Sequence, residues 1–282
     1  MKQVKIFDLQ FSKNEIKYFI KNSKNIFKEG FFSNHSYVKK FEKEFKKQNK
    51  SKFVLSTSSG TSALEIILRS FNVKNKDVLV NSNTFIATGH AITNAGGNII
   101  PIDLEKNYYM MDPEDLKKKI KKNTGAVVIV HIGGIISPNI LKIKKICKQF
   151  GVPLIEDAAQ AQGSKFKNTY AGNFGDAGAI SFFTTKVMTT GEGGMITTKN
   201  RKNFDKIYSL RQFGFTKNKL LHDKVSGNYK LNEFSALLGL IELKRLKSRI
   251  KKRNLISNFY YQFLKNSKYK ILKSNKPFLH TL

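Results

Sequence analysis

From residue 53 onward, short apolar runs alternate with segments whose apolar residues recur every three or four positions. The short runs predict β-strands, and the segments with the longer period predict helices. The strand and helix segments pair as FVLSTS with TSALEIILRS, VLVNSN with TFIATGHAITNAG, NIIPID with DPEDLKKKIKK, and AVVIVH with PNILKIKKICKQFG, followed by VPLIED. This alternation predicts an α/β fold with a mostly parallel sheet that helices cover on both faces.

Single residues support these boundaries. The runs AVVIVH and VPLI are almost entirely apolar, as expected of strands that are buried on both sides. Asp112 and Pro113 form the pair expected at a helix start, with Asp112 as the N-cap and Pro113 as the first helical residue. Gly151 is placed to end the helix that precedes VPLIED.

The second half of the chain departs from strict alternation. The strands AGAISFF and GMITTK follow each other without a long helix between them, and a helix is predicted over residues 200–214. A longer helical pattern extends from Asn232 to about Asn266. We expect three parts: an N-terminal helical segment (1–30), a large domain (31–240), and a linking helix with the start of a truncated small C-terminal domain (241–282). The chain ends at Leu282 before that small domain could be completed, so most of it is expected to be missing.

Composition narrows the class of protein. The chain has 282 residues, of which 40% are hydrophobic, which is enough to bury a full core. It contains no apolar stretch of membrane-spanning length, so we expect a soluble, cytoplasmic protein without a membrane partner. The single cysteine, Cys147, lies on the apolar side of a helical pattern and is expected in the core. It cannot form a disulfide framework, and the histidines at 35, 90, 222 and 280 show no metal-ligand spacing, so no metal site is predicted.

The formal net charge of +31 raises the alternative of a nucleic-acid-binding module. However, the basic residues are 45 Lys and only 6 Arg, and Arg is the residue that recognises bases and phosphates by a planar fork. The lysine runs also fall in amphipathic helical patterns, where solvated faces are expected. We therefore do not expect nucleic-acid binding, although a positive field would attract an anionic substrate that carries a diphosphate.

Three segments carry candidate chemistry. Lys186 follows the strand AGAISFF and precedes a glycine-rich turn, where an amine could face a cofactor, although a single lysine among 45 is more often a surface charge. Asp157 ends the strand VPLIED and could pair with a pyridinium nitrogen, or else cap a helix or form a salt bridge. Residues 56–70 (STSSGTSALEIILRS) place small polar residues at a helix start, which suits either a phosphate or a simple cap.

These segments occur in a series that resembles the DegT/DnrJ/StrS family of sugar aminotransferases, a branch of the fold type I enzymes that use pyridoxal 5'-phosphate (PLP). The matching segments are KKFEKEF (39–45), SSGTSAL (58–64), NTFIATGHAITNAGG (83–97), PLIEDAAQA (153–161), GNFGDAGAISFFTTKVMTTGEGGM (172–195) and GNYKLNEFSALLGL (227–240). The resemblance implies the three-layer α/β/α large domain of PLP-dependent transferases of fold type I.

The resemblance also implies roles for individual residues. Lys186 would carry PLP as a Schiff base, and Asp157 would pair with the pyridine nitrogen. Gln160 would lie near the phenolic oxygen, and Phe85 would stack on the ring. The phosphate would be held by Gly60, Thr61, Ser62 and Ser181, joined by Asn228 from the partner subunit of a homodimer.

The implied reaction is transamination of a nucleotide-diphosphate-linked keto sugar to an amino sugar, with glutamate as the amino donor, in cell-surface polysaccharide or glycan biosynthesis. A PLP-dependent sugar dehydratase is an alternative, but family members that dehydrate are expected to carry His in place of Lys186. A truncated or non-catalytic protein that binds PLP or a nucleotide sugar is a second alternative. Departures from the family pattern at His35-Ser36, Gly227 and Lys230 limit the transfer of substrate specificity.

Two further polar residues have structural interpretations. His131 ends the strand AVVIVH, and we expect a hydrogen-bonded histidine at the strand end rather than a catalytic one. Glu192 lies in the turn GEGG, and we expect its carboxylate to pair with the backbone of that turn.

Overall fold

The computed structural model describes residues 9–215, 222, 224–269 and 278–279. Residues 1–8 of the expected N-terminal segment, and residues 270–277 and 280–282 of the expected C-terminal part, lie outside the described residues. They include His280 and Leu282.

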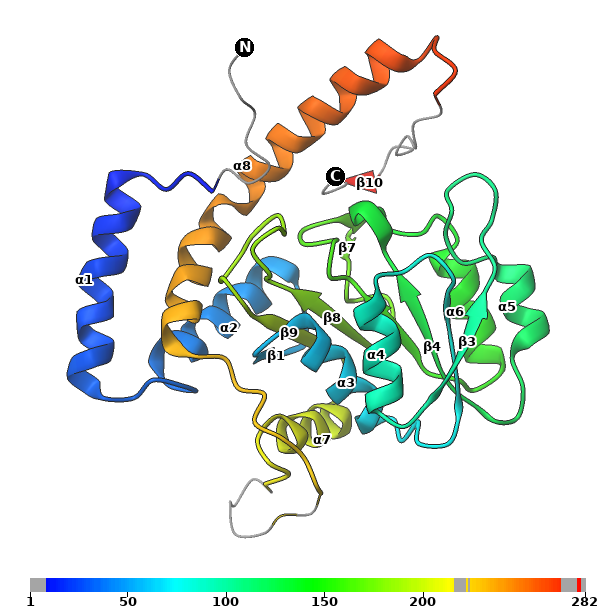
Figure 1. Cartoon of the computed structure of the whole chain (residues 1–282), viewed down its shortest axis with the longest axis horizontal. Helices are drawn as coiled ribbons and strands as arrows, with labels where there is room; N and C mark the ends of the chain where they lie inside the picture. Colours follow the sequence, from blue (N-terminus) through cyan, green and yellow to red (C-terminus); the bar gives the residue numbers. More distant parts are fainter. Residues whose placement is uncertain (1–8, 216–221, 223, 270–277, 280–282) are drawn as a thin grey trace.

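A seven-stranded sheet forms the centre of the molecule (Figure 1), with the strand order β1-β9-β8-β5-β4-β2-β3. All neighbouring pairs are parallel except those of β9, which is antiparallel to both β1 and β8. The strands are β1 (Phe53–Thr57), β2 (Asp77–Asn81), β3 (Asn98–Ile102), β4 (Thr124–Val130), β5 (Leu154–Asp157), β8 (Ala177–Ser181) and β9 (Gly194–Thr198). The predicted, mostly parallel sheet is therefore confirmed, and β9 reverses because only a loop connects it to β8.

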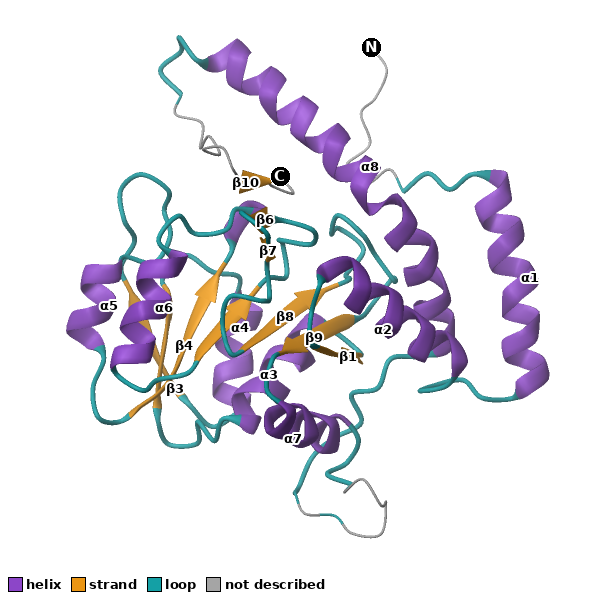
Figure 2. Cartoon of the chain, turned by 180° about the vertical axis from the view of Figure 1, so that it is seen from behind, coloured by secondary structure: helices purple, strands orange, loops and turns teal. Residues whose placement is uncertain are grey.

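Helices cover both faces of the sheet, which makes three layers (Figures 1 and 2). One face packs on α3 (Gly60–Ser70), α4 (Ile86–Asn94) and α7 (Arg201–Arg211), and the other on α2 (Ser36–Asn49), α5 (Pro113–Lys119), α6 (Ile140–Gln149) and α8 (Glu233–Leu264). The expected three-layer fold is confirmed.

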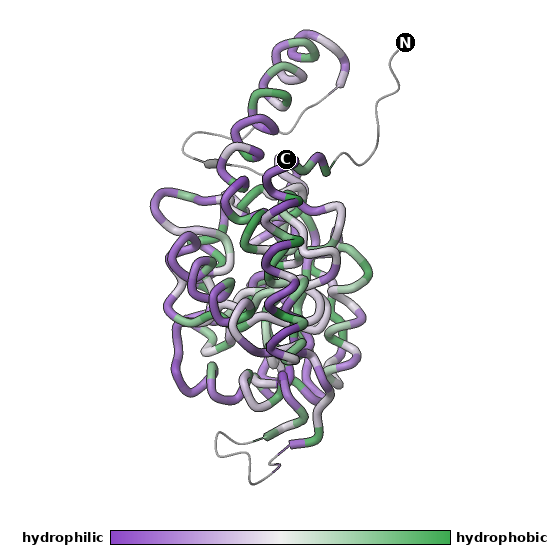
Figure 3. Tube along the Cα trace, turned by 90° about the vertical axis from the view of Figure 1, so that its left-hand side faces the viewer, coloured by the Kyte–Doolittle hydropathy of each residue, from purple (hydrophilic) through white to green (hydrophobic). Residues whose placement is uncertain are grey.

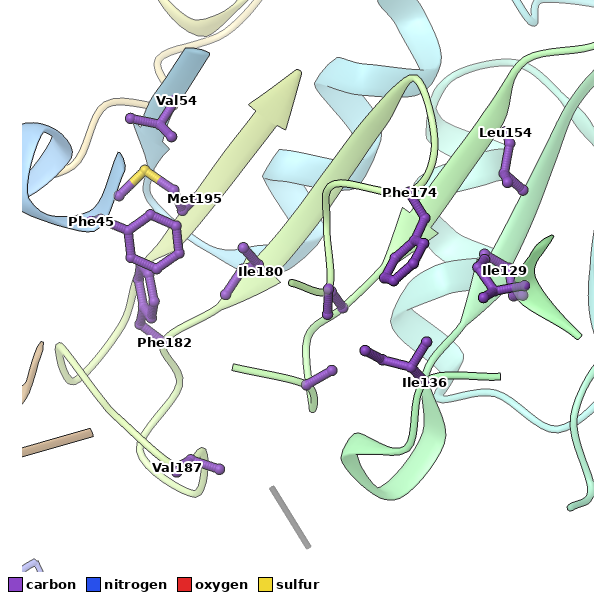
Figure 4. Packing of buried hydrophobic residues seen from close by; sticks show 14 of the residues in the cluster. Phe45, Val54, Ile129, Ile136, Leu154, Phe174, Ile180, Phe182, Val187 and Met195 are labelled. Carbon is purple, nitrogen blue, oxygen red and sulfur yellow. The ribbon is translucent and has the colours of Figure 1, made fainter. Parts of the chain in front are cut away.

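Alternation along the strands divides the core into two hydrophobic clusters. In β4, Val127 and Ile129 face the cluster on the α6 side, whereas Ala126 and Val128 face the cluster on the α3 side. Successive side chains of a strand point to opposite faces, so a strand that is apolar throughout must be buried on both. Figure 4 shows part of the first cluster, where Phe45 lies close to Phe182; these rings meet edge to face, with centroids 5.8 Å apart. Cys147 belongs to this cluster, as predicted.

The predicted caps are present. The Asp112 side chain accepts a hydrogen bond from the backbone N–H of Glu114, and Pro113 is the first residue of α5. Gly151 has φ of +66° just after α6, a left-handed conformation that glycine adopts without strain. One cap was not predicted: the Asn232 side chain caps α8 by accepting from the N–H of Ser235. These caps explain why the helices begin and end close to the positions read from the sequence.

Three features lie outside the three layers. Helix α1 (Lys13–Glu29) begins with a Ser12–Glu15 capping box and packs against α8. The short strands β6 (Lys165–Phe166) and β7 (Thr169–Tyr170) form a hairpin, and β10 (Phe278–Leu279) pairs with β6. Helix α8 continues past the sheet, and apolar and polar residues alternate along its projecting part (Figure 3). No helix in the described part of the chain is both long enough and apolar enough to span a membrane.

Candidate active site

A cavity of about 380 Å³ opens at the edge of the sheet where the parallel strands end. Val130 and His131 come from the end of β4, Asp157 from the end of β5, and Ser181 from the end of β8. In open α/β sheets, ligands bind outside the carboxyl ends of the strands. The remaining lining residues are Ser59, Gly60, Thr61, Leu64, Phe85, Ala87, Thr88, Ala159, Gln160, Phe183, Thr185, Lys186 and Glu192.

The N-terminus of α3 forms one wall of the cavity. A reciprocal capping box between Ser59 and Ser62 fixes the first turn, and the N–H groups of Gly60 and Thr61 belong to the first-turn donors that lack an acceptor within a helix. A Cβ at position 60 would lie 2.7 Å from the Cβ of Ser181, so only glycine permits this close approach of α3 to β8. The wall is therefore suited to a phosphate group.

A buried carboxylate, that of Asp157, lies deep in the cavity. It accepts a hydrogen bond from Thr88 Oγ1 at 2.7 Å and one from the N–H of Ala159 at 3.1 Å. Burial raises the pKa of Asp157 above its ordinary value, although the hydrogen bond from Thr88 opposes the shift. A cationic ligand group beside Asp157 would favour the charged carboxylate.

The amine of Lys186 faces the same cavity from the loop between β8 and β9. Partial burial lowers the pKa of Lys186, and the carboxylate of Asp157 opposes this shift. Among the described residues, the amine has no hydrogen bond or salt-bridge partner. It is thus available to a ligand, and a larger share of it is neutral than for a surface lysine.

Fully buried His131 lies between this cavity and the carboxylate of Glu156. Its Nε2 lies 3.0 Å from Glu156 Oε2, which confirms the expected hydrogen-bonded histidine at the strand end. Glu156 also accepts from the backbone N–H groups of Gly172, Phe174 and Gly175, so we assign the Nε2 proton to the histidine. The other ring nitrogen, Nδ1, is buried and has no hydrogen-bond partner within the described residues. The sequence did not predict this unpaired nitrogen.

The cavity brings together seven of the nine residues to which the family resemblance gave a role. These are Gly60, Thr61, Phe85, Asp157, Gln160, Ser181 and Lys186. Phe85 is 67% exposed and lies at the N-cap of α4, where its ring remains free to cover a ligand. Gln160 accepts a hydrogen bond from the N–H of Gly133 through its Oε1.

Two of the candidate residues do not line the cavity. The side chain of Ser62 is engaged in the capping box of α3. Asn228 is exposed, pairs through the backbone with Gln212, and accepts from the N–H of Lys230 at 3.4 Å. A role for Asn228 at a cofactor thus needs a site other than the cavity of its own chain.

The sequence interpretation missed Thr88 and misplaced Glu192. Thr88 lies in the segment 83–97, which was read as a helix and as a family motif without a role for this residue, and its hydroxyl donates to Asp157 Oδ2 at 2.7 Å. Glu192 lines the cavity, and its carboxylate has no hydrogen-bond partner in the described part of the chain, so the expected pairing with the turn backbone is wrong. The signals for Thr88 were its place after the end of a strand and its position in a segment that matches the family series.

Comparison with known families agrees with this site. The family model described as the DegT/DnrJ/EryC1/StrS aminotransferase family matches residues 13–277. This chain belongs to that family. The aminotransferases of the family use PLP, which suits the phosphate-binding wall and the Lys186–Asp157 arrangement.

Individual relatives in the family are sugar aminotransferases. The GDP-perosamine synthase of Escherichia coli O157:H7 is 32% identical over 252 residues, which cover 88% of this chain and 68% of that protein. The UDP-4-amino-4,6-dideoxy-N-acetyl-beta-L-altrosamine transaminase of Campylobacter jejuni (strain 81-176) is 34% identical over 223 residues, 77% of this chain and 59% of that protein. The crystal structure of a family aminotransferase from Brucella abortus shares the fold, with a TM-score of 0.93 at 24% identity over 99% of this chain and 77% of that one.

Proposed function

We propose that this protein is a PLP-dependent aminotransferase that converts a nucleotide-linked keto sugar to an amino sugar, with Lys186 as the reacting amine. The observation that carries the proposal is the arrangement of Lys186, Asp157 and the N-terminus of α3 around one cavity. Sugar aminotransferases among the relatives, including the GDP-perosamine synthase, support the reaction type.

The residues of the cavity fit PLP on three counts. The N-terminus of α3 with Gly60 suits the phosphate, and the buried carboxylate of Asp157 suits a protonated ring nitrogen. The free amine of Lys186 suits the aldehyde. When bound, PLP would supply an aldehyde that takes up an amino group and a ring that withdraws electrons from the carbon beside it.

The chain's own residues would place and move protons. Asp157, supported by the hydrogen bond from Thr88, would keep the proton on the ring nitrogen. Lys186 would take a proton from the α-carbon of the amino donor and return it to the neighbouring carbon of the cofactor, because burial leaves its amine neutral more often than that of an exposed lysine.

The proposal also covers the substrate, the amino donor, the location of the enzyme and its oligomeric state. The substrate is a nucleotide-diphosphate keto sugar, the amino donor is glutamate, and the enzyme acts in the cytoplasm in polysaccharide or glycan biosynthesis. The net charge of +31 favours an anionic substrate. The enzyme is a homodimer in which Asn228 reaches the phosphate site of the partner subunit, which is supported by the exposure of Asn228 and by its absence from the cavity lining of its own chain.

The activity test uses the purified chain with PLP, glutamate and keto sugars linked to GDP or UDP. We expect formation of an amino sugar together with 2-oxoglutarate, and loss of both products in Lys186→Ala. Lys199→Ala is the matched control, because the pKa of Lys199 is also lowered, mainly by desolvation, but this residue lies at the opposite edge of the sheet. Equal loss in both variants, or product formation by Lys186→Ala, would contradict the proposal.

The shared site has its own test. Lys186→Ala and Asn228→Ala chains are mixed, unfolded and refolded together, and their activity is compared with that of each variant alone. If Asn228 completes the partner's site, a mixed dimer contains one site with both residues intact, and activity returns. If Asn228 acts within its own chain or not at all, mixing restores nothing beyond the activity of the separate variants.

A further inference from the structure

Two hydrogen bonds attach the loop that carries Lys186 to α8, and the loop backbone accepts in one and donates in the other. Arg249 Nη1 donates to the backbone carbonyl of Val187 at 3.1 Å, and the backbone N–H of Thr189 donates to Glu242 Oε2 at 3.2 Å. Val187 directly follows Lys186, and Figure 4 shows it in the turn of the loop beyond Phe182. The main chain is thus fixed on α8 within three residues of the amine.

Glu242 and Arg249 also bind each other. They are seven residues apart, which is about two helical turns, and therefore lie on the same face of α8. Arg249 Nη2 lies 2.8 Å from Glu242 Oε1, and Nη1 lies 2.8 Å from Oε2, so the pair is bidentate. The side chain of Glu242 is fully buried, and that of Arg249 is 18% exposed. The pair therefore presents one donor and one acceptor to the loop at a fixed spacing.

Filling the space between α8 and the loop does not by itself require the charges of Glu242 and Arg249. Burial raises the pKa of Glu242, and the guanidinium of Arg249 opposes the shift, so each charge depends on the other. Replacing both members of a buried ion pair with apolar residues often leaves stability unchanged or raises it, whereas removing one leaves an uncompensated charge. An apolar pair would fill the space but would leave the carbonyl of Val187 and the N–H of Thr189 without partners.

We infer that the Glu242–Arg249 pair is a positioning device that holds residues 187–189 so that the amine of Lys186 faces Asp157. The inference rests on the proposed function in that it takes Lys186 as the reacting amine. Glu242 and Arg249 are positioning residues, since neither lines the cavity. Their effect reaches the site only through the backbone of the loop.

Arg245 offers a matched control on the same helix. Its Nη1 donates to Glu242 Oε1 at 3.3 Å. Its other contacts lie near the start of α1, with the carbonyl of Gln10, the ring of Phe11 and the carboxylate of Glu15. It makes no hydrogen bond to residues 182–193. Arg245→Leu therefore removes a charge from the same network without touching the loop.

The first experiment measures hydrogen exchange at the amide of Thr189 in the chain without PLP. In Glu242→Leu/Arg249→Leu, we expect exchange to be roughly five- to tenfold faster, the factor that corresponds to one lost hydrogen bond. Arg245→Leu is expected to exchange like the wild type. Wild-type exchange in the double variant, or equal acceleration in Arg245→Leu, would overturn the inference.

The second experiment follows the rate at which an amine reagent modifies Lys186 as the pH is varied, again without PLP. The wild-type midpoint is expected below 10.5, the ordinary lysine value, and the double variant is expected to shift it upward because a released loop exposes the amine. A pair that only stabilises the fold would leave this midpoint unchanged in a double variant that melts like the wild type.

Arg249→Lys provides a further variant if the double variant does not fold. Lysine keeps the charge but lacks the planar fork, so it cannot bind Glu242 and the carbonyl of Val187 in the same geometry. We expect a smaller upward shift of the Lys186 midpoint, and an unchanged midpoint would overturn the inference. Because both measurements omit PLP, failure of the proposed function would appear separately, as wild-type chain that does not form a reducible adduct with PLP at Lys186.

Discussion

Replacing Glu156 with glutamine tests the buried hydrogen-bond network behind the cavity. Glu156 Oε1 accepts from the N–H groups of Phe174 and Gly175 at 2.6 and 2.7 Å, and Oε2 accepts from Gly172 at 2.7 Å as well as from His131. In either orientation, a glutamine amide would place an NH₂ group against at least one of these N–H donors. The substitution keeps the shape of the side chain but removes at least one of these hydrogen bonds.

The expected cost follows from these contacts. One buried donor left without an acceptor costs about 1–3 kcal/mol, and the remaining bonds lose the strength that a charged acceptor gives. We therefore expect Glu156→Gln to lower the free energy of unfolding by about 3 kcal/mol, measured by urea denaturation.

Glu105→Gln is the matched control for this loss. Glu105 accepts from the N–H groups of Asn107 and Tyr108, but near the surface, where water can replace a lost partner. We expect it to lose no more than about 1 kcal/mol. A loss in Glu156→Gln as small as that in the control would refute the account of the buried network.

Three further predictions concern the cavity and the core. The native chain holds the Asp157 proton to a higher pH than the unfolded chain, so the contribution of Asp157 to stability falls as the pH rises between the two pKa values. Asp157→Asn should therefore raise the melting temperature of the PLP-free protein at pH 7. The same substitution should abolish the rise in melting temperature that PLP causes in the wild type. Thr88→Val removes the hydrogen bond to Asp157, and fluorescence titration should show a roughly tenfold rise in the PLP dissociation constant. Burial raises the pKa of Cys147 to about 12, so a thiol reagent should modify it only when urea unfolds the chain; fast modification of the folded protein would contradict its burial.

The layers of the fold could be predicted because strand and helix periodicities are local. The apolar run of β4 and the cap at Asp112 each carry their own signal, and the structure places both where the sequence indicated. The β6–β7 hairpin was not predicted, because each strand has only two residues and shows no alternation that could be recognised.

The candidate site was less accessible to sequence interpretation. Lys186 and Asp157 were found because their motifs occur in a recognisable series, and both line the cavity. Thr88 and the Glu242–Arg249 pair act through contacts between residues far apart in the chain, at separations of 69 residues for Thr88–Asp157 and 53 for Thr189–Glu242. No local pattern reports such contacts, and a buried glutamate or arginine on a lysine-rich helix resembles its solvated neighbours until the helix is packed.

The central claim is that Lys186, among 45 lysines, is the residue that binds PLP. The direct measurement is borohydride reduction of the PLP-loaded chain, followed by digestion and mass spectrometry of every lysine-containing peptide. The account predicts stoichiometric labelling of Lys186, with no label at Lys199, whose pKa is also lowered by desolvation. Label at Lys199, or label spread over surface lysines with Lys186 unmodified, would contradict it.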